Sequence, residues 1–140
     1  MARSFWLVKS EPSEYAWARL VADRATLWTG VRNAAARNHL AAMKPGDLVL
    51  YYHTGDEKAV VAVAKVTGEA RPDPTGKDGG WVAVELAPLK ALAAPVPLAA
   101  IKADLKLRDL ALVRQSRLSV MPIPQPAFEA IVALGKTKLR

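Results

Sequence analysis

The chain has 140 residues, of which 51% are hydrophobic, and no cysteine, which excludes disulfides, thiolate zinc sites and a cysteine nucleophile. This length is typical of one domain, and no apolar run approaches the roughly 18 residues of a membrane span, so we expect a single domain over residues 1–140 in the reducing cytoplasm. The net charge of +7 lies at the two ends, with seven basic and four acidic residues over 1–50, five and six over 51–101, and eight and three over 102–140.

The first predicted elements are a strand and a helix. Residues 4–9 are rich in β-forming residues and apolar on both faces, so they predict a buried strand, which Pro12 ends. Ser13 can cap a helix over residues 14–22, where apolar side chains recur at helical spacing. Residues 26–28 then predict a short extended piece.

A second helix is predicted after a break at Gly30. The Asn33 side chain can accept a hydrogen bond from an orphan backbone N–H, so Asn33 is the predicted N-cap of a helix over residues 34–43. Arg37 follows Asn33 by four residues and therefore lies on the same side of this helix.

The rest of the chain predicts short strands and short helices separated by turn signals. The predicted segments are strands at 48–52, 59–66 and 81–86, an exposed and mobile loop at 71–80, helices at 97–103 and 107–113, a strand at 117–121, a helix at 126–134 stopped by Gly135, and a frayed basic tail at 136–140. This pattern favours an α+β fold built on a small, strongly curved sheet or barrel over a doubly wound sheet.

Two sequence blocks carry a family resemblance. Residues 5–12 read Phe-Trp-Leu-Val-Lys-Ser-Glu-Pro, and residues 28–33 read Trp-Thr-Gly-Val-Arg-Asn, followed by Ala-Arg-Asn at 36–38. Through these blocks, and through shorter matches as far as 117–120, almost the whole chain resembles an EVE domain, a branch of the PUA-like fold related to YTH and ASCH domains. The resemblance implies a PUA-like small β-barrel of five or six strands with peripheral short helices.

The resemblance also implies a function, namely binding of DNA or RNA with recognition of a modified base such as methylcytosine or hydroxymethylcytosine. It places Trp6, Trp28 and Tyr52 at or near a pocket, because bases stack on aromatic side chains. Apolar atoms of Val31 can contact a base methyl group, and Gly30 gives the chain beside Trp28 a hinge. All three aromatic residues can instead be core residues, and Trp28 is the preferred stacking residue.

Polar side chains follow the first strand, where they can project into a pocket mouth. Ser10 can donate and accept hydrogen bonds, Lys9 can hold a phosphate or a base carbonyl, and Glu11 can accept from an exocyclic amine such as N4 of cytosine. The alternative is that Lys9 and Glu11 form a structural ion pair before Pro12.

The start of the second helix offers forked donors and amides. We assign Asn33 to the base edge, with a role as helix cap alone as the alternative, and Arg32 and Arg37 to phosphate or pocket structure. Asn38 belongs to the same group of candidate ligand-binding residues.

Further along the chain, Arg117 and Ser119 share one face of a predicted strand and extend the pocket if that face lines it. His53 can donate to a ligand or have a structural role. Neither His39 nor His53 has a second ligand at a metal-binding spacing, so we expect no metal and no cofactor.

The leading expectation is therefore a binding module without catalytic activity, selective through stacking and edge recognition. The alternative is a small amidohydrolase acting on a modified nucleoside, since certain ASCH-type relatives use Lys, Glu and Thr side chains. Lys9 and Glu11 can fill two of these roles, but the sequence does not place Thr26 or Thr29 beside them. A protein-interaction surface at the Pro-rich loop near 72–74 is a third alternative.

Overall fold

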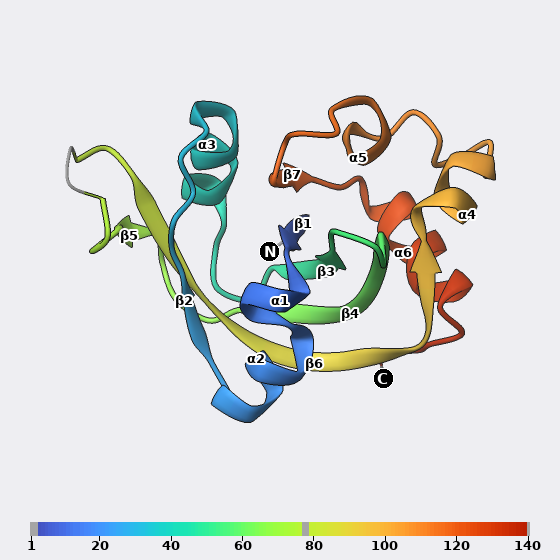
Figure 1. Ribbon diagram of the computed structural model, residues 1–140, viewed down its shortest axis with the longest axis horizontal. Helices are drawn as coiled ribbons and strands as arrows, with labels where there is room; N and C mark the ends of the chain where they lie inside the picture. The colour runs from blue at the N-terminus through green and yellow to red at the C-terminus, as the bar shows by residue number, and fades with distance from the viewer. Residues whose placement is uncertain (1–2, 77–78, 140) are drawn as a thin grey trace.

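The computed structural model describes residues 3–76 and 79–139, in which one mixed sheet curls into a half-barrel with short helices around it (Figure 1). The elements in chain order are β1 (Phe5–Ser10), α1 (Pro12–Tyr15), α2 (Trp17–Asp23), β2 (Thr26–Trp28), α3 (Ala34–Ala42), β3 (Leu48–His53), β4 (Ala59–Val66), β5 (Arg71–Pro72), β6 (Val82–Pro97), α4 (Leu98–Ala103), α5 (Ala111–Arg114), β7 (Val120–Pro122) and α6 (Gln125–Leu134). This architecture confirms the predicted α+β fold with a small, strongly curved sheet.

The strand order is β2-β6-β4-β3-β1-β7, with β5 added on β6. β1 runs parallel to β3, and every other pairing is antiparallel. The parallel pair sets Lys9 beside Tyr52 and Ser10 beside His53, so both strands end at the same edge of the sheet. β2 and β5 both pair with the first residues of β6, and the loops that follow these two short strands therefore meet.

β6 is much longer than the sequence predicted, because it continues past Leu86 to Pro97 and includes Pro88 and Pro95. Proline cannot donate to a ladder and is tolerated in strands at edges and bulges. The pairing of β4 with β6 shifts register twice, next to Val61 and Val63, which provides such irregular positions. The long bent strand forms much of the half-barrel wall in Figure 1.

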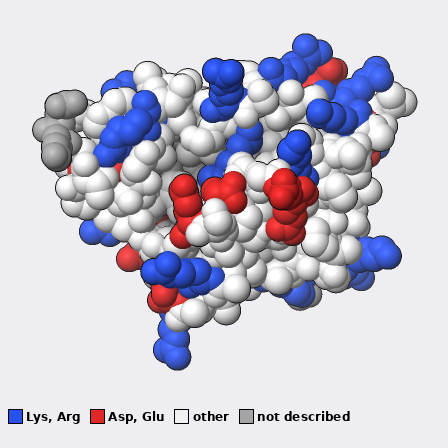
Figure 2. All heavy atoms as spheres, viewed as in Figure 1, with Lys and Arg blue, Asp and Glu red and all other residues white. Residues whose placement is uncertain are grey.

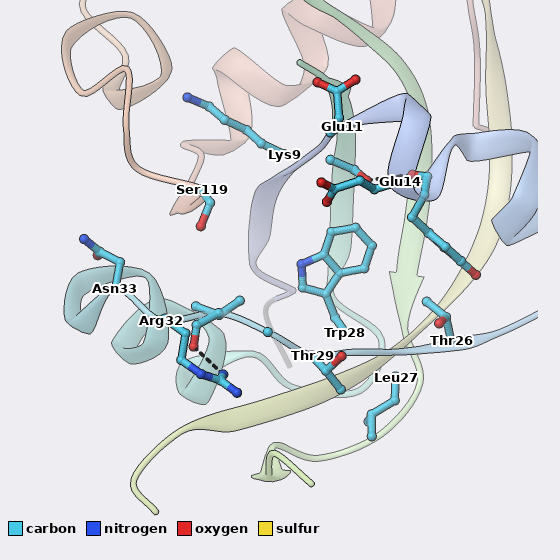
Figure 3. A pocket seen from close by; sticks show the side chains of 14 residues that line it. Lys9, Glu11, Glu14, Thr26, Leu27, Trp28, Thr29, Arg32, Asn33 and Ser119 are labelled. Atoms are coloured by element: carbon cyan, nitrogen blue, oxygen red, sulfur yellow. Dashed lines mark hydrogen bonds between the residues drawn. The ribbon is translucent and has the colours of Figure 1, made fainter. Parts of the chain in front are cut away.

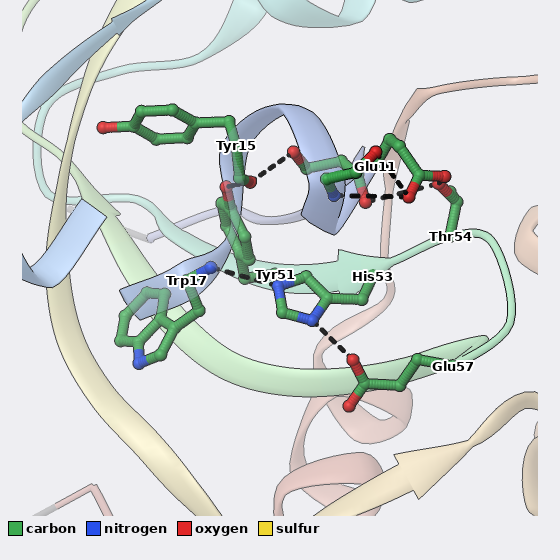
Figure 4. Close-up of polar contacts among 9 residues, drawn as sticks. Glu11, Tyr15, Trp17, Tyr51, His53, Thr54 and Glu57 are labelled. Atoms are coloured by element: carbon green, nitrogen blue, oxygen red, sulfur yellow. Dashed lines mark hydrogen bonds and ion pairs between the residues drawn. The ribbon is translucent and has the colours of Figure 1, made fainter. Parts of the chain in front are cut away.

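The helix predicted over residues 14–22 is divided at Ala16, whose backbone is extended. The Tyr15 carbonyl accepts from the hydroxyls of Ser10 (2.6 Å) and Tyr51 (2.8 Å), and the Trp17 N–H donates to Nε2 of His53 at 3.0 Å (Figure 4). Side chains of the sheet thus satisfy the backbone groups at the break.

The N-cap of α1 is Glu11, whose side chain accepts from the Ser13 N–H at 3.3 Å. The prediction of Ser13 as the cap is therefore wrong, and Ser13 lies inside the helix.

The C-terminal third also departs from the sequence prediction. Where a helix was predicted over 107–113, the helix α5 begins only at Ala111 and ends at Arg114, and the strand predicted at 117–121 begins at Val120. Residues 136–139 of the tail, expected to fray, instead lie against β6, where Lys90 Nζ donates to the Lys138 carbonyl at 2.7 Å. No helix in the described part of the chain has the length and apolar character needed to cross a membrane.

Candidate functional site

A pocket of about 410 Å³ opens where the end of β1 meets α1, β2 and the segment leading into α3 (Figure 3). Its size lies within the roughly 300–1,000 Å³ range of small-molecule sites. The residues that line it are Lys9, Ser10, Glu11, Glu14, Tyr15, Thr26, Leu27, Trp28, Thr29, Gly30, Val31, Arg32, Asn33 and Ser119. The pocket thus joins nine of the predicted site residues, which come from three separate parts of the chain.

Trp28 stands in the middle of these residues, with its ring nitrogen on the side of Ser119 and Asn33 (Figure 3). Its half-buried indole packs nearly perpendicular to Tyr51 at 5.6 Å and to Tyr15 at 6.3 Å between ring centroids. Edge-to-face aromatic contacts of this kind stabilise one ring orientation. The pocket therefore contains an aromatic surface that is fixed before any ligand arrives.

The wall beside Trp28 is held by Asp73, whose carboxylate has no exposed surface. One carboxylate oxygen accepts from the Gly30 N–H at 2.8 Å and from Arg32 at 3.0 Å, and the other accepts from the N–H and hydroxyl of Thr75, both at 2.7 Å. Gly30 has a φ of +82°, a backbone conformation that favours glycine. The turn at Gly30, which the sequence predicted to be flexible, is thus held in place by the buried Asp73 carboxylate.

The environment of Asp73 also changes its acidity. Burial raises the pKa of the carboxyl, but the hydrogen bonds from Thr75, Gly30 and Arg32 outweigh burial and hold its pKa well below the ordinary value. Asp73 is consequently ionised at neutral pH. It is the partner that neutralises Arg32, so Arg32 belongs to the pocket structure rather than to a free cationic surface.

Asn33 is the helix cap predicted from the sequence, and it also lies in the pocket lining. Its Oδ1 accepts from the Ala36 N–H at 2.9 Å, which confirms it as the N-cap of α3. The same side chain lines the pocket, and its amide nitrogen stays available to a ligand.

The charged groups at the mouth of the pocket do not form the ion pair considered from sequence. Lys9 Nζ donates to the Ser116 carbonyl at 2.9 Å, and burial lowers the pKa of this ammonium. The Glu11 carboxylate accepts from Ser13 and from the Thr54 hydroxyl, each at 3.3 Å. Glu14 is exposed and is the acidic side chain that α1 adds to the mouth.

The surface around the mouth has mixed charge. Acidic side chains gather in the middle of the face drawn in Figure 2, over α1 and the turn after β3, and basic side chains lie around them and along the upper rim. A ligand that enters this pocket therefore meets hydrogen-bond acceptors as well as cations.

A comparison of the chain with known protein families identifies the family to which it belongs. The family model described as EVE domain matches residues 4–134. The chain belongs to the EVE domain family. A solved protein from Rhodopseudomonas palustris is 43% identical with a TM-score of 0.90, covering 95% of this chain and 93% of that one.

Two human comparisons agree with this EVE domain assignment. Human thymocyte nuclear protein 1 is 29% identical over 94% of this chain and 73% of its own length. The crystal structure of human THYN1 protein in complex with DNA containing 5-methylcytosine is 29% identical with a TM-score of 0.86, covering 96% and 99% of the two chains.

Trp6 of this EVE domain does not line the pocket. Its side chain is 7% exposed, and its indole N–H donates to Asp47 Oδ2 at 2.9 Å. Asp47 also accepts from the N–H groups of Ser4 and Lys44, each at 3.0 Å. Trp6 is therefore a core residue and not a pocket residue, which is the alternative that the sequence left open.

Tyr52 and His53 are also outside the pocket of the EVE domain. Tyr52 is buried beneath Lys9, whose Nζ lies 5.8 Å from its ring centroid. His53 accepts from the Trp17 N–H at Nε2, so Nδ1 carries the hydrogen donated to Glu57 at 2.7 Å. Both ring nitrogens are occupied inside the protein, which gives His53 a structural role.

Arg37, Asn38 and Arg117 lie beside the pocket of the EVE domain rather than in it. Arg37 donates to Asn38 Oδ1 at 3.1 Å and lies 5.6 Å from the ring centroid of Trp81, as Arg32 also does. Arg117 does not share a strand face with Ser119, because both precede β7, and only Ser119 lines the pocket.

Sequence reasoning missed several residues of this EVE domain site. They are Glu14, Tyr15 and Leu27 in the lining and Asp73, Thr75 and Trp81 behind it. Thr26 and Thr29, which the sequence offered only as partners of Lys9 and Glu11 in the amidohydrolase alternative, line the pocket as well. The signal for Asp73 was the spacing Asp-Pro-Thr, in which an Asp side chain binds the backbone two residues on. Loop composition instead predicted exposure, and Lys77 and Asp78 of that loop lie outside the described residues. Among the described residues, no three His, Cys, Asp or Glu side chains gather as a metal site would require.

Proposed function

We propose that this EVE domain binds DNA or RNA and takes a modified cytosine into the pocket beside Trp28. The observation that carries the proposal is the half-buried Trp28 indole, fixed by Tyr15 and Tyr51 inside a pocket rimmed with hydrogen-bonding groups. Unstacking a base costs a few kcal/mol, and stacking on an aromatic side chain returns roughly 1–3 kcal/mol. The human relative in complex with 5-methylcytosine-containing DNA supports the same ligand class.

Edge recognition would come from the groups around the indole. The Glu14 carboxylate can accept from the N4 amine of cytosine, whereas the O4 carbonyl of uracil or thymine would repel it. This is the role that sequence reasoning gave to Glu11, whose carboxylate binds Ser13 and Thr54 instead. Val31 would offer apolar contact to a methyl group, and Asn33 a donor to a base acceptor.

The test is a titration of labelled single-stranded oligonucleotides that carry cytosine, 5-methylcytosine or 5-hydroxymethylcytosine at one position. We expect unequal affinities, and a loss of about 5- to 150-fold for the preferred oligonucleotide in Trp28→Ala, from the stacking free energy. Trp28→Phe keeps an aromatic face and should retain part of the affinity. Trp17→Phe removes an indole outside the pocket and serves as the matched control. Equal affinity for all three oligonucleotides, unchanged in Trp28→Ala, would refute the proposal.

A second candidate function is supported by one observation, which is that Thr26 and Thr29 line the pocket together with Lys9. These residue types are the ones that the amidohydrolase alternative requires. In that reaction water would add to the amide carbonyl of an N4-acylcytidine, releasing cytidine and a carboxylic acid. Release of cytidine by the wild type and not by Lys9→Ala would favour this function, and no release by the wild type would exclude it.

A further inference from the structure

A second hollow of about 300 Å³ lies next to the pocket, and Asn33 lines both. Its other lining residues are Ala35, Gln115, Ser116, Arg117 and Leu118. The two hollows are therefore neighbours that share the residue Asn33. A chain that left the pocket past Asn33 would enter the second hollow directly.

The segment 115–119 contributes to the lining of both hollows and is anchored to the rest of the protein. On the pocket side, Lys9 Nζ donates to the Ser116 carbonyl and the Lys9 N–H donates to the Ser119 carbonyl, both at 2.9 Å. Leu118 is 6% exposed and its N–H donates to the Gln115 carbonyl at 3.0 Å. The backbone that presents Arg117 is thus attached to β1 and to the core.

Arg117 is the charged side chain of the second hollow. It is exposed, and none of the ion pairs among the described residues includes it, whereas the nearby Arg114 is paired with Asp109. None of the described residues that line this hollow is acidic. The Gln115 amide and the Ser116 hydroxyl add two neutral donors beside the guanidinium.

We propose that this second hollow binds a backbone phosphate of the nucleotide next to the one held in the pocket. The proposal rests on the proposed function, because a strand whose base enters the pocket must keep its sugar and phosphates outside the mouth. A guanidinium fork matches a phosphate group with two parallel hydrogen bonds. Arg117 would then contribute affinity that does not depend on the base, while Trp28 contributes the selectivity.

The first test is the salt dependence of binding to the oligonucleotides above, measured for wild type, Arg117→Ala and Arg71→Ala, an exposed arginine outside both hollows. Arg117→Ala should weaken binding of all three oligonucleotides by the same factor, about fivefold or more, and leave their ratios unchanged. Its slope of log K against log salt should be smaller by about 0.7, the value for one phosphate contact on a single strand. An effect no larger than that of Arg71→Ala would overturn the proposal.

The second test replaces one phosphate beside the modified base with an uncharged methylphosphonate. The wild type should lose affinity for this oligonucleotide, whereas Arg117→Ala should lose little more, because the contact is already absent. Equal losses in both proteins would overturn the phosphate site and leave base recognition by Trp28 standing. Selective binding that is insensitive to Trp28→Ala would refute only the base pocket, and a wild type that binds no oligonucleotide would refute both.

Discussion

The Gly30 N–H donates to Oδ2 of Asp73 at 2.8 Å, across 43 positions of sequence. The same oxygen accepts from Arg32, so a single buried carboxylate fixes the turn between Trp28 and α3. The residues of this turn, 29–33, line the pocket. The shape of the site therefore depends on a residue that does not line it.

We expect Asp73→Asn to lower the free energy of unfolding by about 3 kcal/mol, because it removes a buried carboxylate that accepts hydrogen bonds from Gly30, Arg32 and Thr75. The amide keeps the shape of the carboxylate but presents an N–H₂ group toward donors of Gly30, Arg32 or Thr75. Urea denaturation at neutral pH measures the loss. Asp56→Asn, at an exposed position, is the control, and an Asp73→Asn protein as stable as wild type would show that the contacts contribute nothing net.

The contribution of Asp73 should also depend on pH. Its pKa in the folded protein lies below the value of about 3.9 expected in the unfolded chain, so the unfolded state takes up a proton first as pH falls. The stabilisation is therefore fully present above about pH 4 and is lost progressively below it. We expect the stability difference between wild type and Asp73→Asn to be constant from pH 7 to pH 5 and to shrink below pH 4. A difference that grows on acidification would contradict this assignment.

The sequence predicted best those features whose partners are close along the chain. The Asn33 cap binds an N–H three residues away, and α3 follows directly from it. Features set by distant partners were not predictable in this way. The break at Ala16 is made by Tyr51 and His53, and the burial of Asp73 is made by Gly30 and Arg32.

The same distinction between local and distant partners applies to the residues of the candidate site. Residues 28–33 lie in the pocket because β2 runs directly into its wall, which a contiguous motif can indicate. Trp6 has the same residue type as Trp28, and its burial and its long-range hydrogen bond to Asp47 show that it belongs to the core. The length of β6 was missed because its proline residues resemble strand ends until the register shifts with β4 are known.

Trp6→Phe tests this difference between the two tryptophans. Losing the indole N–H leaves the Asp47 carboxylate with one donor fewer, and the smaller ring leaves a void, so we expect a loss of about 2 kcal/mol in the free energy of unfolding. Oligonucleotide affinity and selectivity should remain as in the wild type. Trp28→Phe is the matched variant, with the opposite expectation for affinity. A Trp6→Phe protein that loses selectivity while staying folded would place Trp6 in the ligand site.

Tyr51 packs edge-to-face against the Trp28 ring. We expect its phenol to be the last of the three tyrosine phenols to ionise as pH rises. Burial raises the pKa of its phenol to about 12, and its hydroxyl donates to the Tyr15 carbonyl at 2.8 Å. Burial raises the pKa of Tyr15 and Tyr52 as well. Since the unfolded pKa is about 10, the stabilisation by neutral Tyr51 is fully present below pH 10 and is lost as pH rises toward 12.

A spectrophotometric titration of phenolate absorbance can follow this ionisation, with near-ultraviolet circular dichroism as a monitor of tertiary structure. We expect the last phenol to ionise near pH 12 together with loss of the tertiary signal, because a charged Tyr51 cannot stay packed against Trp28 at 5.6 Å. Tyr51→Phe should remove this last step and keep the earlier ones. Ionisation of all three tyrosines near pH 10 with the fold intact would show that Tyr51 is open to solvent, and the aromatic support of Trp28 would then be weaker than its geometry indicates.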